Sequence, residues 1–124
     1  MNKINKGFLC LVLILLQAQT LQAQDSRGIT LTSDGRFPLN DGLCGTVIYT
    51  LAQSTMLKRQ DGASISEMVA NASKSDKLFG FNNTVRDMTL ASYEHPQLTS
   101  KQNRNIAATD FATSWTVSCY KAQR

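Results

Sequence analysis

Apolar positions after about residue 40 recur at the spacing of a helix. The first stretch repeats its buried-type residues at steps of three and four, namely Cys44, Val47, Ile48, Leu51 and Thr55. These positions fall on one face, because an α-helix has 3.6 residues per turn. Asn40 or Asp41 can cap the start of this helix through a side-chain oxygen. Glycine readily adopts the left-handed conformation of a helix end, so we expect the helix to stop at Asp61-Gly62.

A second helix is predicted immediately afterwards. Ser64 and Glu67 have the spacing of a capping box, in which side chain and backbone satisfy each other's donors. The apolar face that follows fades at residues 73–76, Ser-Lys-Ser-Asp, so we expect this helix to be short. The next connection carries the apolar residues 78–81, Leu-Phe-Gly-Phe, which we expect to tuck beneath the bundle.

Two further helices complete the pattern. Asn82 or Asn83 can cap the third, which ends at His95 because Pro96 disfavours helical geometry in the residue before it. A second capping box, Thr99 to Gln102, starts a last helix that we expect from about Ser100 to Tyr120. Its apolar stripe is spaced by four residues: Phe111, Trp115 and Cys119. The pattern predicts an all-α fold, a small four-helix bundle with one short helix.

The N-terminal residues carry a targeting signal rather than part of the bundle. Residues 1–23 combine a basic start, an apolar run too short to span a bilayer and a small residue, Ala23, at the end. This pattern predicts a cleaved secretory signal peptide, with an uncleaved anchor as the alternative. Residues 24–39 have little apolar content and are predicted to form a flexible lead-in, with a short edge strand as the alternative. The helical domain then covers residues 40–124.

Cleavage changes the charge of the protein. Loss of Lys3 and Lys6 lowers the formal net charge from +4 to +2. The remaining basic residues are not clustered in the way that nucleic-acid binding requires, so we expect no nucleic-acid partner. No later apolar run is long enough to span a membrane, and the mature chain is therefore predicted to be soluble.

Cleavage also leaves two cysteines, Cys44 and Cys119, which we expect to form a disulfide. Each lies on the predicted buried face of its helix, one in the first and one in the last. A bridge closing so long a loop contributes roughly 4 kcal/mol through the unfolded state. Two free buried thiols are the alternative. Two cysteines and the lone His95 do not make the four ligands of a zinc site, so we expect no metal.

The sequence offers no catalytic constellation, and we predict neither catalytic residues nor a cofactor. His95 precedes a proline and is interpreted as a surface turn residue rather than a general base. The carboxylates are scattered, and only Asp110, beside Phe111, can lie near the edge of the core. We therefore expect a protein that is not an enzyme.

The residues that favour a binding surface are Arg59, Tyr93 and Tyr120, since arginine and aromatic residues are enriched at binding hot spots. Two of them have a structural alternative: Arg59 caps a helix and Tyr93 packs a helix end. Trp115 belongs to the same residue types, but it is interpreted as the central core residue.

Two short motifs give a resemblance. Residues 59–64 read Arg-x-x-Gly-x-Ser, and residues 91–96 read Ala-x-Tyr-x-x-Pro. Together with Phe111 and the two cysteines, they resemble a loose group of small exported proteins of Gram-negative bacteria and their phages. The resemblance covers roughly Cys44 to Cys119. It implies a periplasmic or secreted, helical, disulfide-linked protein and assigns no activity.

Export, small size and a stapled scaffold favour a non-enzymatic protein-binding or inhibitory module, similar in action to immunity proteins. Its expected partner is another envelope protein. A small envelope chaperone or stress protein is the alternative. A hydrolase using Asp110 or Glu67 is a third and less favoured hypothesis.

Overall fold

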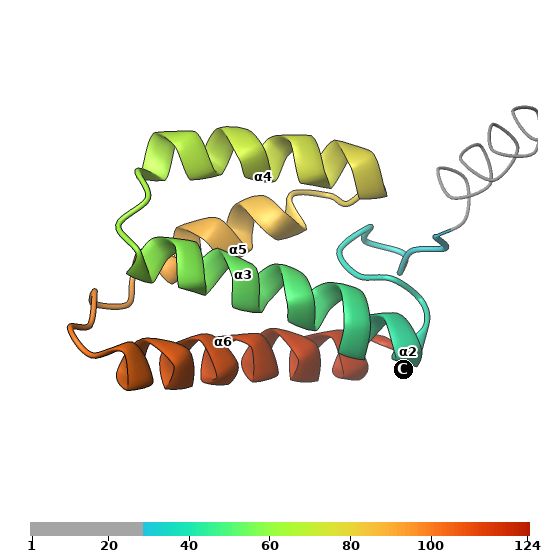
Figure 1. The fold of residues 1–124 in the computed structure, drawn as a ribbon. Helices are drawn as coiled ribbons and strands as arrows, with labels where there is room; N and C mark the ends of the chain where they lie inside the picture. The colour runs from blue at the N-terminus through green and yellow to red at the C-terminus, as the bar shows by residue number, and fades with distance from the viewer. Residues whose placement is uncertain (1–28) are drawn as a thin grey trace, which may run out of the picture.

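The computed structural model describes residues 29–124, which form a bundle of helices (Figure 1). Its elements are α2 (Asp41–Leu43), the π-helical η1 (Cys44–Ile48), α3 (Tyr49–Gln60), α4 (Ile65–Phe79), α5 (Thr84–Ser92) and α6 (Lys101–Ala122). The first three follow one another without a break and make one helical stretch. The prediction of an all-α bundle is confirmed. The predicted signal peptide lies outside the described residues.

The helices form two packed pairs, and α5 joins its own pair to the other. α6 runs along α3, whereas α4 packs on α5, and α5 in turn packs on α3 (Figure 1). The fully buried Ile48, Met56 and Met88 lie at the centre of the core. None of the helices within residues 29–124 has the length and apolar content needed to cross a bilayer.

The second helix is longer than predicted. α4 continues through the polar residues 73–76 to Phe79 and ends at Gly80, whose φ of 76° is the left-handed conformation. Asp76 is buried rather than part of a fading end. Its carboxylate accepts hydrogen bonds from the backbone N–H groups of Val85 (2.7 Å) and Arg86 (3.0 Å). The end of α4 therefore supplies the N-terminal cap of α5.

The short helix of the bundle is accordingly α5, the third helix, and not the second. Asn83 occupies its N-cap position with a φ of 59°, but the Asn83 side chain makes no capping hydrogen bond. The first N–H groups of α5 are satisfied by Asp76 instead. Local sequence does not reveal such a cap, because donor and acceptor belong to different helices.

The apolar connection behaves only in part as predicted. Phe81 is buried and stacks on Phe79, with 5.3 Å between ring centroids. Leu78, however, belongs to α4 and is 73% exposed. The extension of α4 decides this outcome, because helical geometry turns Leu78 away from the face that carries Ala72 and Asp76.

Two predicted caps are present, and a third is displaced by one residue. Asn40 accepts a hydrogen bond from the N–H of Gly42 (2.8 Å), and Ser64 accepts one from the N–H of Glu67 (3.4 Å). The cap of α6 is Ser100, which accepts from the N–H of Asn103 (3.1 Å), and not Thr99.

Residues 31–39 fold onto the bundle, although the sequence assigns them to a flexible lead-in. Leu31 and Pro38 form an isolated antiparallel bridge around a turn at Gly35, whose φ is 71°. Phe37 and Pro38 are buried. A single phenylalanine in a polar segment produces no periodic pattern, so local spacing does not predict this contact with the core.

The same turn is fastened to the connection between α4 and α5. The N–H of Asn82 donates to the carbonyl of Gly35 (2.8 Å), and Arg36 pairs with Asp87 of α5 (2.5 Å). Within the turn, the Thr32 hydroxyl and then the Arg36 N–H donate to the carboxylate of Asp34. These hydrogen bonds stabilise the charged form and lower the pKa of Asp34.

Candidate functional site

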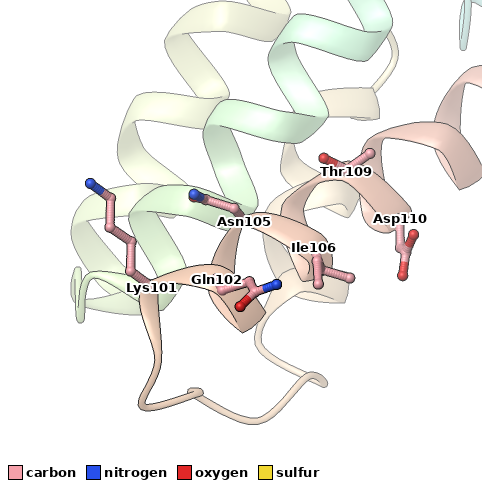
Figure 2. Close-up of a pocket in the computed structure, with 6 residues that line it drawn as sticks. All are labelled: Lys101, Gln102, Asn105, Ile106, Thr109 and Asp110. Atoms are coloured by element: carbon pink, nitrogen blue, oxygen red, sulfur yellow. The ribbon is translucent and has the colours of Figure 1, made fainter.

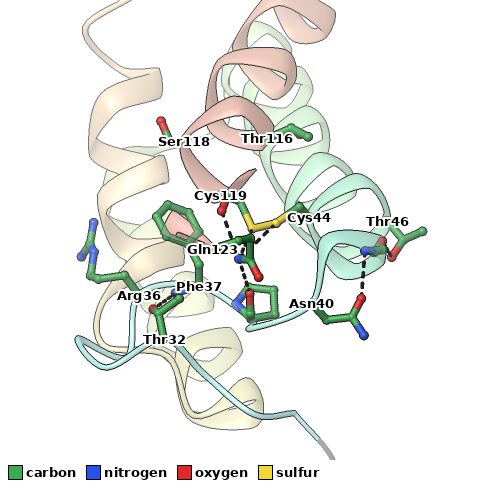
Figure 3. The surroundings of a disulfide bond; sticks show 12 residues. Thr32, Arg36, Phe37, Asn40, Cys44, Thr46, Thr116, Ser118, Cys119 and Gln123 are labelled. Carbon is green, nitrogen blue, oxygen red and sulfur yellow. Dashed lines mark hydrogen bonds between the residues drawn. A yellow bond between two sulfur atoms is a disulfide. The ribbon is translucent and has the colours of Figure 1, made fainter. Parts of the chain in front are cut away.

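The predicted disulfide joins Cys44 of η1 to Cys119 of α6 (Figure 3). The two Cα atoms are 5.6 Å apart across 75 residues of sequence. Both cysteines are completely buried. A thiol that exchanges disulfides must reach one of the sulfur atoms, so burial favours a structural role. The bridge holds α6 against the first helical stretch.

Gln123 completes this end of the bundle. Its Nε2 donates to the carbonyl oxygens of Pro38 (2.8 Å) and Cys119 (3.0 Å), and it lies beside the disulfide in Figure 3. One side chain thus ties the turn at residues 31–39 to the last turn of α6. We refer to this region as the disulfide end.

Two of the three residues predicted for a binding surface come together at the opposite end. The guanidinium of Arg59 lies 4.7 Å from the ring centroid of Tyr93 and donates to the carbonyl of His95 (3.2 Å). The Tyr93 hydroxyl donates to the carbonyl of Ala63. Both side chains are half-buried. They fasten the α5–α6 loop to the end of α3. Tyr93 thus packs against a helix end, whereas Arg59 bonds to a loop carbonyl and does not cap a helix.

Tyr120 lies apart from this pair. It follows Cys119 and is therefore at the disulfide end, where its side chain is 45% exposed. Arg59 is fifteen residues beyond Cys44, a rise of about 22 Å along a helix. The three residues therefore do not make one continuous surface.

The last residue of α3 is a buried glutamine that the sequence did not predict as a site residue. Gln60 is inaccessible to solvent, its Oε1 accepts from the N–H of Leu98 (2.7 Å), and its Nε2 donates to the carbonyl of Pro96 (2.9 Å). Gln97 returns a bond to the carbonyl of Gln60 (3.0 Å). We refer to this network, with Arg59 and Tyr93, as the loop end. Nothing in the spacing of residues marks a polar residue at a helix terminus as buried.

A groove lies between α5 and α6, because α5 packs on α3 and α4 rather than on α6. Its volume is about 410 Å³. It is lined by Ala91, His95, Ala107, Asp110, Phe111, Ser114 and Trp115. The five α6 residues share one helix face because they are separated by steps of three and four. We call this the α5–α6 groove.

The floor of the α5–α6 groove is aromatic. The ring of His95 meets that of Phe111 edge-on at 5.7 Å, and Phe111 is followed by Trp115 at 6.4 Å. Trp115 in turn contacts Phe37 at 6.4 Å. Trp115 is only half-buried, so it belongs both to the edge of the core and to the groove. The aromatic contacts run from the α5–α6 loop to the N-terminal turn.

The groove opens at Asp110 onto the outer face of α6 (Figure 2). This face of α6 carries Lys101, Gln102, Asn105, Ile106, Thr109 and Asp110. In Figure 2 the side chains stand in two adjacent rows, with Gln102, Ile106 and Asp110 in one of them. Ile106 is half exposed. Asp110 belongs to both linings, so a carboxylate lies where the aromatic groove meets the outer face.

The groove contains the residue types of a hydrolase without their geometry. His95, Asp110 and Ser114 all line it, but within residues 29–124 no hydrogen bond joins any two of them. A nucleophile must lie within hydrogen-bond distance of its base to be activated. The described part of the chain also holds no group of three or more histidine, cysteine or acidic residues able to bind a metal.

Comparison with known proteins adds no assignment. No protein-family model matches the sequence, and neither a curated protein nor a solved structure is significantly similar to it.

Proposed function

We propose that this protein is an exported, non-enzymatic module that binds another protein of the cell envelope through α6 and the α5–α6 groove. The observation that carries the proposal is the aromatic groove opening onto a face with the half-exposed Ile106. Aromatic and apolar groups surrounded by polar side chains are typical of protein interfaces. An inhibitory, immunity-like action is the form that we favour.

The scaffold supports this proposal. The disulfide holds α6 against η1 at one end, and the Gln60 network holds the α5–α6 loop at the other. A surface held at both ends loses little conformational freedom when it binds, and this favours affinity. The disulfide also fits an oxidising compartment such as the periplasm.

The proposal is tested by placing a photo-crosslinking amino acid at Ser114, in the groove, and in a matched variant at Ser66, on α4. Both serines are exposed, and only Ser114 lines the groove. We expect Ser114 to give one discrete adduct in cells of the native host and Ser66 to give none. Indistinguishable products from the two positions, or no adduct at Ser114, would contradict the proposal. The activity of the captured protein, with and without the purified module, then tests inhibition.

An envelope chaperone is a second candidate, favoured by exposed apolar residues outside the groove. Leu78 and Leu39 are 73% and 50% exposed. Such residues bind unfolded clients when they are accessible. A chaperone gives many unrelated adducts at both crosslinking positions and suppresses the aggregation of unrelated proteins. Failure to protect any client at neutral or acidic pH would remove this candidate.

A further inference from the structure

The carboxylate of Asp110 carries a charge that no described residue neutralises. The ion pairs within residues 29–124 involve Asp87 and Asp61, and Asp110 is exposed at the edge of the groove. Lys101, which lines the same outer face, is nine residues away, a rise of about 13 Å along the helix. Because this separation is too great for a direct ion pair, the negative charge is available to a ligand.

The rings beside Asp110 favour the same kind of ligand. Phe111 and Trp115 line the same groove as Asp110. The face of an aromatic ring carries negative electrostatic potential, which attracts organic cations. A carboxylate beside an aromatic floor therefore favours an organic cation over an anion. Within the groove lining, His95 is the only residue that can carry a positive charge.

The shape of the groove suits a long, narrow side chain. Its opposite sides carry Ala91 of α5 and Ala107 of α6, two residues whose small side chains leave space between the helices. A volume of about 410 Å³ is within the range of small-ligand sites and admits the side chain of arginine or lysine.

We infer that the α5–α6 groove binds a lysine or arginine side chain presented by the partner protein, with Asp110 as the counter-charge and Trp115 and Phe111 as the apolar floor. The inference rests on the proposed function and names the chemistry of the partner.

Trp115 makes this inference testable, because it is the one tryptophan of the chain and it lines the groove. The probes are the peptide acetyl-Ala-Arg-Ala-amide and the same peptide with citrulline, which keeps the shape of arginine and removes its charge. Titration of the full protein is followed by tryptophan fluorescence. We expect the arginine peptide to bind about tenfold more tightly than the citrulline peptide.

Two variants, each lacking one negative charge, test whether the preference depends on Asp110 or on the net charge of the protein. Asp110→Asn should abolish the preference for the arginine peptide. Glu67→Gln removes one negative charge from α4, which does not line the groove, and should leave the preference unchanged. Equal affinity of the two peptides for the unmodified protein would overturn the inference. Full preference in Asp110→Asn would overturn it as well.

Tetramethylammonium tests whether the cation bound in the groove is a small molecule and not a protein side chain. This ion carries a positive charge without a polypeptide. Binding of this ion as tightly as the arginine peptide would overturn the assignment to a protein side chain. The inference and the proposed function fail separately. A discrete adduct at Ser114 with no preference for the arginine peptide would overturn only the inference about the cationic side chain. A preference for the arginine peptide without an adduct at Ser114 would overturn only the proposed protein partner.

Discussion

The two ends of the α3–α6 pair are closed by different chemistry. At the disulfide end, the Cys44–Cys119 bond acts largely by limiting the unfolded chain. At the loop end, Gln60 and Arg59 act through hydrogen bonds and a ring contact that exist only in the folded chain. The amide of Gln60 is paired at both its oxygen and its nitrogen, whereas the buried Nε of Arg59 has no hydrogen-bond partner among the described residues.

The comparison also separates stability from function. The loop end holds His95, whose carbonyl accepts a bond from Arg59 and whose ring borders the α5–α6 groove. The disulfide end lies at the far end of α6 from this loop (Figure 1). Damage to the loop end should therefore change the groove, whereas loss of the disulfide should chiefly lower the free energy of unfolding.

The largest expected effect follows removal of the disulfide. Cys119→Ser should lower the free energy of unfolding by about 2–5 kcal/mol, because the unfolded chain regains the freedom of a loop spanning 75 residues. Urea denaturation measures the change. Reduction should destabilise the unmodified protein by a similar amount and leave the variant unaffected. An unchanged melting temperature would show that the bridge does not stabilise the fold.

Loss of the buried amide at the loop end should rank second. Gln60→Ala leaves the N–H of Leu98 and the carbonyl of Pro96 without their partner, and we expect a loss of about 2–3 kcal/mol. Gln53→Ala on the same helix is the control, since Gln53 is only half-buried. Equal effects of the two substitutions in urea denaturation would argue against the network.

Gln123→Ala tests the corresponding amide at the disulfide end. It removes the bond to the carbonyl of Pro38 and should cost about 1 kcal/mol, because the disulfide still holds the helix nearby. Hydrogen exchange should show faster opening of residues 31–39 than of α3. Uniform acceleration over both regions would contradict a local role.

Arg59→Lys should have a smaller effect, about 0.5–1 kcal/mol, because lysine keeps the charge but loses the planar contact with Tyr93. The substitution also removes the guanidinium bond to the carbonyl of His95. We expect NMR shifts of His95 and Phe111 to move with it. If those shifts stay in place while partner binding is lost, Arg59 contacts the partner directly.

The smallest effect concerns pH. Asp34 has its pKa lowered by the bonds from Thr32 and Arg36, so its charged form stabilises the turn above the ordinary value of 3.8. That contribution is lost as the pH falls through the lower, folded pKa. Asp34→Asn should therefore reduce the melting temperature slightly at pH 7 and by a smaller amount at a pH below 3.8. An equal effect at both values would exclude this titration as the cause.

The spacing of apolar residues correctly predicted the helices that bury a regular apolar face. The helix containing Cys44 and Ile48 and the one containing Phe111 and Cys119 were located because their apolar residues recur at helical spacing. The disulfide was predicted from the two cysteines that remain after signal cleavage, and their positions on the two apolar faces supported it. The predicted end of α4 was wrong, because Asp76 was interpreted from its polarity alone. In the fold, Asp76 caps α5.

The candidate site could be predicted only in part. The shared face of Phe111 and Trp115 follows from their spacing of four residues along one helix. That Ala91 and His95 stand opposite them depends on how α5 is placed, which no local pattern states. Arg59 and Tyr93 were selected by residue type, and their contact with each other also came from the packing.

The amino-acid sequence by itself determined the helical class, the caps at Asn40 and Ser64, and the pairing of Cys44 with Cys119. These features depend on neighbours within a few residues, or on there being one available partner. Tertiary structure alone decided the burial of Gln60 and Phe37 and the groove beside Trp115. Each of these results from contacts between segments that are distant in sequence, and side-chain spacing carries no information about such contacts.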